Sequence, residues 1–228
     1  MIRPGVGETI IVIEHHIPLY EKTNYLKPEL VVKTYVALLP FPTTRRMVDN
    51  YIYRFLKKID RLDLAEIYGL LPFEITTQII ERTLVDKVFA LCDYYLQGKI
   101  SGHSRHLYDI YKIVETIGIT DEMERLIPEV RGVRSKLDVC PAAKEGVCIT
   151  EILEAIVEEQ AYKKDYEEIT MGLLFITETY DTVIQSIQKL INSGVWNLIT
   201  RYKRDREHLV LCSFLFLLAS IKNQQFIE

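Results

Sequence analysis

Cysteine is scarce in this 228-residue sequence, and its four copies form neither a CxxC pair nor a zinc-ligand spacing: Cys92, Cys140, Cys148 and Cys212. A disulfide framework or a structural zinc site is therefore not expected. Cys92 lies within a helical apolar pattern, which suits a buried free thiol. This cysteine usage is typical of a reducing compartment, and we predict a cytoplasmic protein.

An excess of positive charge is also missing. The formal net charge of −4 gives no general attraction to nucleic acid or to an anionic membrane, so any polyanion site must be local. Residues 1–7 are polar rather than basic and then apolar, which argues against a signal peptide. The longest apolar run, residues 209–221, falls short of the roughly 18 residues of a membrane span. It suits a buried helix or a partner-binding surface, and we expect no membrane association.

Common catalytic signatures are absent as well. The sequence contains no Walker loop, GxGxxG, GxSxG or HExxH. The adjacent pair His15 and His16 has no cysteine near it and is weak evidence for a metal site. We assign no metal ligand from these residues.

Residues 81–115 are the chemically richest stretch and predict a helical hairpin. Thr83 and Asp86 fit a capping box for the first helix, which Gly98 follows. Ser104 fits the N-cap of the second helix, and Gly118 follows its end. Apolar residues recur at helical spacing in both helices: Leu84, Val88, Leu91, Tyr95, Leu107, Ile110, Ile113 and Val114.

The polar face of this hairpin carries two cations and two carboxylates, namely Lys87, Asp93, Arg105 and Asp109. On antiparallel helices, Lys87 and Asp109 would be offset along the axes by roughly 9 Å. That offset is too long for a contact ion pair unless the helices cross steeply, and it suits two groups that flank an extended ligand such as a triphosphate. His106 beside Arg105 fits either a base or, more commonly, a hydrogen-bonded structural residue.

The rest of the pattern predicts an α+β protein. Strands are expected at residues 9–13, 30–37 and 73–80, and a helix at 48–59 with its apolar residues on one side. Helices are expected at 122–126, 149–159, 163–175 and 181–191, the third with a solvated charged start. We divide the chain into a small strand-bearing part (1–80), a helical domain (81–195) and a tail (196–228).

Four segments resemble the AbiEii/AbiGii toxin family, which is nucleotidyltransferase-like and occurs in toxin–antitoxin and abortive-infection systems. They are RTLVDKVFAL (82–91), SRHLYDIY (104–111), YLKPELVV (25–32) and YKKDYEEIT (162–170). The resemblance implies a small, incomplete nucleotidyltransferase-like mixed sheet followed by a helical domain. It also implies nucleotidyl transfer from an NTP, GTP or CTP, to an acceptor such as tRNA, with Mg²⁺ as cofactor and an AbiEi-type antitoxin as partner.

By the family pattern, Lys87 binds the nucleotide phosphates, Arg105 supports that site, and Asp109 orients or deprotonates the attacking hydroxyl. The chain departs from the pattern because the Gly-Ser turn and D-x-D pair that hold Mg²⁺ are missing. Lys33 and His106 also stand where acidic residues are usual. We therefore expect a truncated relative that is weakly active or inactive alone. The alternative is a non-catalytic helical interaction module of a toxin–antitoxin or phage-defence system.

Overall fold

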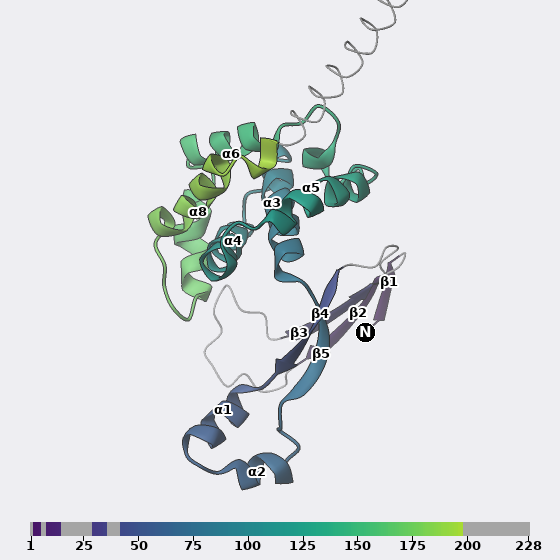
Figure 1. Ribbon diagram of the computed structural model, residues 1–228, viewed down its shortest axis with the longest axis vertical. Coiled ribbons are helices and arrows are strands. Elements are labelled where there is room, and N and C mark those ends of the chain that lie inside the picture. Colours follow the sequence, from purple (N-terminus) through teal and green to yellow (C-terminus); the bar gives the residue numbers. More distant parts are fainter. Residues whose placement is uncertain (1, 6–7, 15–28, 36–41, 198–228) are drawn as a thin grey trace, which may run out of the picture. The chain divides into compact units, whose positions relative to one another are not determined.

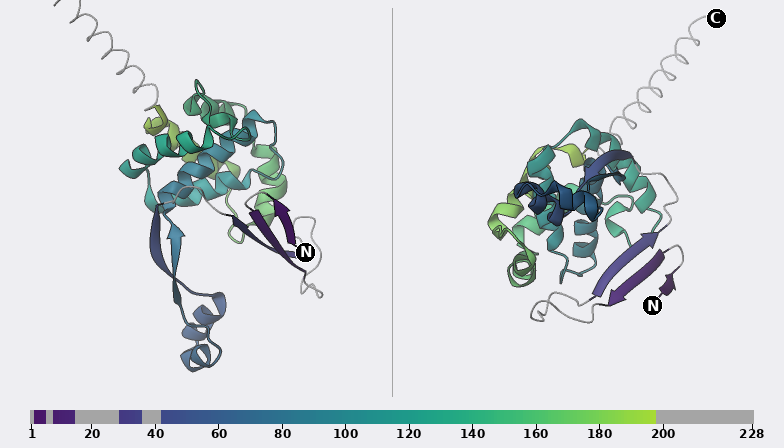
Figure 2. Two further views of the ribbon diagram at one scale, coloured as in Figure 1. Left: turned by 90° about the vertical axis from the view of Figure 1, so that its right-hand side faces the viewer. Right: turned by 90° about the horizontal axis from the view of Figure 1, so that it is seen from below.

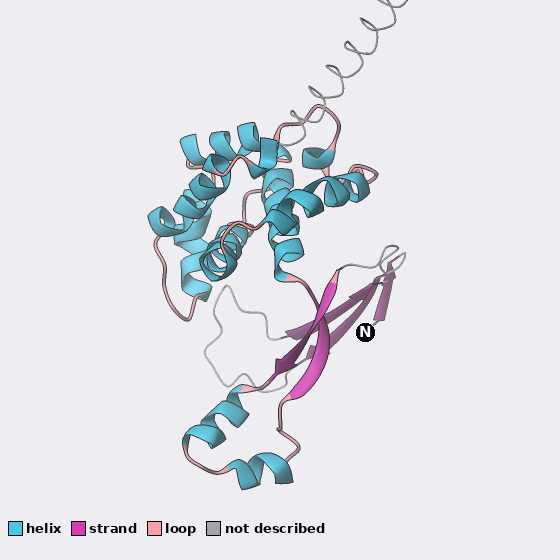
Figure 3. Ribbon diagram, viewed as in Figure 1, coloured by secondary structure: helices cyan, strands magenta, loops and turns pink. Residues whose placement is uncertain are grey.

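In the described residues the strands come before the longer helices, with two short helices between the last two strands, which confirms the α+β class (Figure 3). The computed structural model describes residues 2–5, 8–14, 29–35 and 42–197. The chain divides into two units, Met1–Thr83 and Leu84–Glu228 (Figure 1). Across the described ranges, no helix has the length and apolarity to cross a membrane.

The first unit holds all five strands of the described residues. β1 (Ile2–Gly5), β2 (Glu8–Glu14) and β3 (Glu29–Tyr35) pair antiparallel in that order, and Ile10 lies opposite Lys33. The strand predicted at 9–13 is confirmed as β2, and the one predicted at 30–37 is confirmed as β3 up to Tyr35, with residues 36–37 outside the described ranges. β1 escaped prediction because its sequence, IRPG, contains proline and glycine, which usually mark turns.

A second antiparallel pair joins β4 (Thr43–Val48) to β5 (Phe73–Gln78). Two short helices, α1 (Tyr51–Lys58) and α2 (Leu62–Ile67), connect these strands, and Figure 2 shows the ribbon carrying them at its end. β5 confirms the strand predicted at 73–80 up to Gln78, whereas Ile80 already belongs to the following helix. β4 was missed because TTRRMV is mostly polar and lacks a clear apolar alternation.

The helix predicted at 48–59 is shorter, and its apolar side is not buried as expected. It begins after Asn50, whose side chain accepts a hydrogen bond from the Tyr53 N–H at 2.8 Å. Val48 belongs to β4 instead. Only Leu56 of the expected apolar face is buried, whereas the others are exposed: Tyr51, Ile52, Phe55 and Ile59.

The second unit is helical, with α3 (Ile80–Leu96) entering it from the first. It contains α4 (Arg105–Ile117), α5 (Asp121–Arg134), α6 (Ile149–Glu158) and α8 (Tyr180–Asn192), with a short 3-10 turn η1 at Pro141–Ala143. Buried residues cover several sides of α3: Leu84, Val85, Val88, Phe89, Leu91 and Cys92. Because α3 is enclosed in this way, it forms the centre of the core. α8 packs against α4 and α6.

The predicted helix at 163–175 is broken into three kinds of helical turn. α7 (Lys163–Asp165) continues into the π-helix η2 (Tyr166–Thr170) and the 3-10 turn η3 (Met171–Leu173). Its charged start is only partly solvated, since Asp165 is buried. A π turn adds a residue to each hydrogen-bonded loop and so changes which side chains share a face.

The described chain ends in the 3-10 turn η4 (Val195–Asn197). Trp196 is 3% exposed and meets the Phe89 ring edge-on at 5.5 Å, so the first residues of the expected tail belong to the core. Cys92 is a buried free thiol, as predicted. The apolar run at 209–221 and Cys212 lie outside the described residues.

Candidate functional site

The helical hairpin forms where it was predicted, with two corrections to its caps. α3 begins at Ile80, so Thr83 lies inside the helix, where its hydroxyl donates to the Ile79 carbonyl at 3.3 Å. The expected capping box is therefore wrong. Gly98 and Gly118 follow the two helices with φ of +66° and +69°, a conformation that favours glycine.

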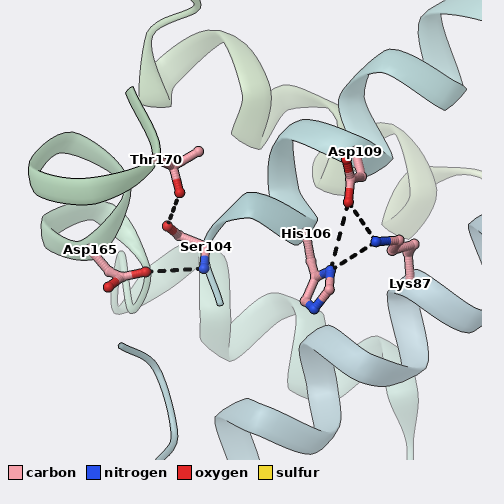
Figure 4. A network of polar contacts seen from close by, with 6 residues as sticks. All are labelled: Lys87, Ser104, His106, Asp109, Asp165 and Thr170. Atoms are coloured by element: carbon pink, nitrogen blue, oxygen red, sulfur yellow. Dashed lines mark hydrogen bonds and ion pairs between the residues drawn. The ribbon is translucent and has the colours of Figure 1, made fainter. Parts of the chain in front are cut away.

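Ser104 occupies the N-cap position of α4 but makes no capping hydrogen bond with its side chain. Its hydroxyl lies 2.6 Å from the Thr170 hydroxyl instead. The cap comes from Asp165, which accepts hydrogen bonds from the Gly102 N–H at 2.7 Å and the Ser104 N–H at 3.1 Å (Figure 4).

Lys87 and Asp109 form a direct ion pair, which corrects the expected axial separation. Lys87 Nζ lies 2.6 Å from Asp109 Oδ2 (Figure 4). The estimate assumed antiparallel helices, whereas Figure 1 shows α4 nearly end-on beside α3. A steep crossing removes the axial offset, and the long lysine side chain spans the remaining gap. The two groups therefore act as one charged pair.

His106 completes a three-residue cluster with this pair. Its Nδ1 lies 3.3 Å from Lys87 Nζ and 3.8 Å from Asp109 Oδ2, and its ring stacks parallel to Tyr94. Burial lowers the pKa of His106, and the positive charges of Lys87 and Arg105 lower it further. The contact with Asp109 raises this pKa but does not outweigh burial. A neutral imidazole follows near pH 7, with Nδ1 within hydrogen-bonding distance of the Lys87 ammonium.

Asp109 remains ionised in this cluster. Burial alone would raise the pKa of Asp109, but its contacts with His106 and Lys87 outweigh burial and hold that pKa below its usual value. The side chains of Lys87 and Asp109 are 30% and 39% exposed. The pair is thus open to a ligand from solvent.

Two other residues of the predicted polar face, Arg105 and Asp93, lie outside the three-residue cluster. Arg105 is exposed at the first position of α4, and it reaches the cluster only through its charge, which lowers the pKa of His106. Asp93 is 3% exposed and accepts from Arg134 at 2.6 Å and from the Ala142 N–H at 2.8 Å. The structure thus removes Asp93 from the candidate site and makes it part of the core.

The described residues do not fit a Mg²⁺ site. No group of three His, Cys, Asp or Glu side chains within them is arranged to hold a metal ion. Asp109, the carboxylate of the cluster, has one oxygen committed to Lys87. Two-metal transfer chemistry uses several closely spaced carboxylates, which the described residues do not bring together around Asp109.

The residues of this site lie within a segment that matches a known protein family. The family model described as nucleotidyl transferase AbiEii toxin, type IV toxin–antitoxin system, matches residues 27–188, more than half of the chain. The chain belongs to this family. The AbiEii match includes α3, α4 and the segment 162–170, and thus every residue of the cluster. Searches of curated proteins and of solved structures found no match.

Sequence reasoning missed Asp165 and Thr170 as parts of this region. Both lie in YKKDYEEIT, which carried part of the family resemblance, but a charged segment is usually a solvated helix face. Only their contacts with the start of α4 show that these side chains point inward.

Proposed function

We propose that the α3–α4 hairpin binds the phosphates of an NTP, and that the chain serves nucleotidyl transfer to an acceptor hydroxyl such as one on tRNA. The observation that carries this proposal is the Lys87–Asp109 pair, which is partly exposed and lies on the two helices of an AbiEii-family match. GTP and CTP are the proposed donors.

Lys87 is proposed as the phosphate ligand. Its ammonium has three hydrogens, and in the cluster two of them face Asp109 and His106. The third is free to meet a phosphate oxygen. A fixed ammonium stabilises the charge that grows on the departing pyrophosphate.

Arg105 and Asp109 are proposed to act on either side of the reacting phosphorus. Arg105 is exposed at the start of α4, where a guanidinium can bind phosphate through two N–H donors. Asp109 orients the attacking hydroxyl and takes its proton as the oxygen–phosphorus bond forms and the bond to pyrophosphate breaks. His106 stays neutral and holds Lys87 in place.

The remaining parts of the proposal follow from the family. An AbiEi-type antitoxin is the proposed partner, abortive infection the proposed setting and the cytoplasm the proposed location. Residues 1–228 alone are proposed to bind NTP weakly and to transfer little or no nucleotide.

Nucleotide-dependent thermal stabilisation tests the site directly. GTP or CTP should raise the melting temperature of the wild-type chain, and Lys87→Ala should abolish this shift. Lys189→Ala is the matched control, because Lys189 of α8 also forms an exposed lysine–carboxylate pair, at 2.7 Å with Glu115 near the end of α4. A nucleotide shift that survives Lys87→Ala would remove Lys87 from the site.

A second function, that of a non-catalytic interaction module, is favoured by the exposed apolar side chains of α1. Tyr51, Ile52 and Phe55 are 86%, 57% and 58% exposed, which is unusual for three neighbouring large side chains. No thermal shift with any NTP in the wild-type chain would favour this function over nucleotide transfer.

A further inference from the structure

The segment 162–170 is attached to both helices of the hairpin. Tyr162 is fully buried, and its hydroxyl donates to the Leu91 carbonyl of α3 at 2.7 Å. Three residues later, the two carboxylate oxygens of Asp165 accept the Gly102 and Ser104 amides at the start of α4. One short segment therefore holds α3 and the first turn of α4 together.

Asp165 supplies the side-chain hydrogen-bond acceptor at the start of α4 that Ser104, the N-cap residue, does not supply. Ser104 has helical dihedral angles and no side-chain cap, and the Gly102 and Ser104 amides just before α4 use Asp165 as their acceptor. Asp165 is 8% exposed, and no cation of the described residues pairs with it. Two N–H donors and the positive end of the α4 dipole therefore balance its charge.

The π-helix explains how a second side chain reaches the same place. Within η2 the Met171 N–H bonds to the Tyr166 carbonyl, five residues back. The wider turn brings residues five apart, such as Asp165 and Thr170, closer to one face than an α-helix would. Thr170 is 2% exposed, and its hydroxyl meets that of Ser104 at 2.6 Å (Figure 4).

The site depends on the position that these contacts set. Lys87 lies on α3, whereas Arg105, His106 and Asp109 lie on the first turns of α4. We propose that Asp165 is a positioning residue: with Tyr162 and Thr170 it clamps the start of α4 to α3, so that Asp109 and Arg105 face the same ligand as Lys87. The part of this inference that concerns the ligand rests on the proposed nucleotide site.

NMR titration of His106 tests the clamp without any nucleotide. Asp165→Asn should loosen the start of α4, hydrate the His106 ring and raise its pKa toward the usual value, since burial is the largest cause of the lowered pKa. Loss of the Asp165 charge alone would lower that pKa, so a rise reports movement. The groups facing His106 stay unchanged in the variant: Lys87, Arg105, Asp109, Tyr94 and His103.

Thr179→Ala is the matched control, because Thr179 caps α8 by accepting from the Thr182 N–H at 3.2 Å, and α8 carries no site residue. It should leave the His106 titration unchanged. An unchanged titration in a folded Asp165→Asn variant would overturn the clamp. Should Asp165→Asn fail to fold, Thr170→Val replaces it, with a smaller rise expected and an unchanged titration again overturning the clamp.

GTP affinity tests the link to the site. Asp165→Asn should weaken GTP binding roughly tenfold, since a displaced Arg105 loses charge-assisted hydrogen bonds to phosphate. In an Arg105→Ala background, Asp165→Asn should reduce GTP affinity little further, because Arg105 is the phosphate-binding residue on α4 that the clamp is proposed to position. Fully additive losses would overturn the link. If the wild-type chain binds no GTP, the proposed function is wrong. The His106 titration still tests whether Asp165 holds the start of α4 in place, because it needs no nucleotide.

Discussion

At the scale of single residues, the Lys87–Asp109 pair is better suited to function than to stability. Both side chains are about a third exposed, and ion pairs in such positions contribute about 0–1 kcal/mol. Substitution of either residue should therefore leave the fold intact. Changes in ligand binding can then be attributed to the site itself.

Asp109 competes with a phosphate for the Lys87 ammonium. Asp109→Asn removes that competitor and a negative charge, so GTP affinity at low salt should rise by about two- to fivefold, the effect of an ion pair of this exposure. Isothermal titration calorimetry measures this change. Glu115→Gln, which frees Lys189 in the same way, is the control and should have no effect. Weaker GTP binding would mean that Asp109 orients Lys87 rather than competing for it.

Because of His106, the free energy of unfolding should decrease at acidic pH. Because its folded pKa is lowered, the unfolded chain binds more protons below the ordinary value of about 6.5. The free energy of unfolding should therefore be highest above pH 6.5 and fall as the pH drops toward the folded pKa. Urea unfolding across pH 5 to 8, compared with His106→Gln, measures this. A slope that persists in His106→Gln belongs to another group.

At the scale of elements, Asp93 connects α3 to α5 and to η1. Asp93→Ala leaves the Ala142 N–H without its acceptor, whereas the Arg134 guanidinium, which is partly exposed, keeps its longer contact with Asp86 at 3.8 Å. A loss of about 1–3 kcal/mol in the free energy of unfolding is expected, as for other buried polar groups left without a hydrogen-bond partner. Denaturant unfolding measures it. Glu115→Ala breaks an exposed pair instead and should cost less than about 1 kcal/mol. Equal losses in both variants would contradict this role of Asp93.

The positions of the two hairpin helices were predicted correctly from local sequence patterns. The cores of α3 and α4 were predicted because their apolar residues recur at helical spacing and are now buried, as at Leu84, Val88 and Leu107. The same rule misplaced the apolar side of α1. Periodicity indicates that residues share a face, but it does not supply the partner that would cover that face.

At the scale of the whole molecule, nucleotide binding and nucleotide transfer make different demands. Binding needs the Lys87 ammonium, whereas metal-assisted transfer needs several close carboxylates, and the described site offers only Asp109. Incubation of the chain with Mg²⁺, radiolabelled GTP or CTP, and tRNA should therefore give weak labelling of the RNA or none. Labelling that Lys87→Ala and EDTA each abolish would show that this chain carries out transfer by itself.

The sequence alone determined the α+β class, the helical hairpin, the family, and the residue types at its site, because these depend on local periodicity and on short motifs. Only the tertiary structure decided that Lys87 contacts Asp109, that Asp93 is buried, and that Asp165 caps a helix 61 residues before it. Such contacts depend on crossing angles and on a π turn. Those are set by packing among segments distant in the chain, which no local pattern specifies.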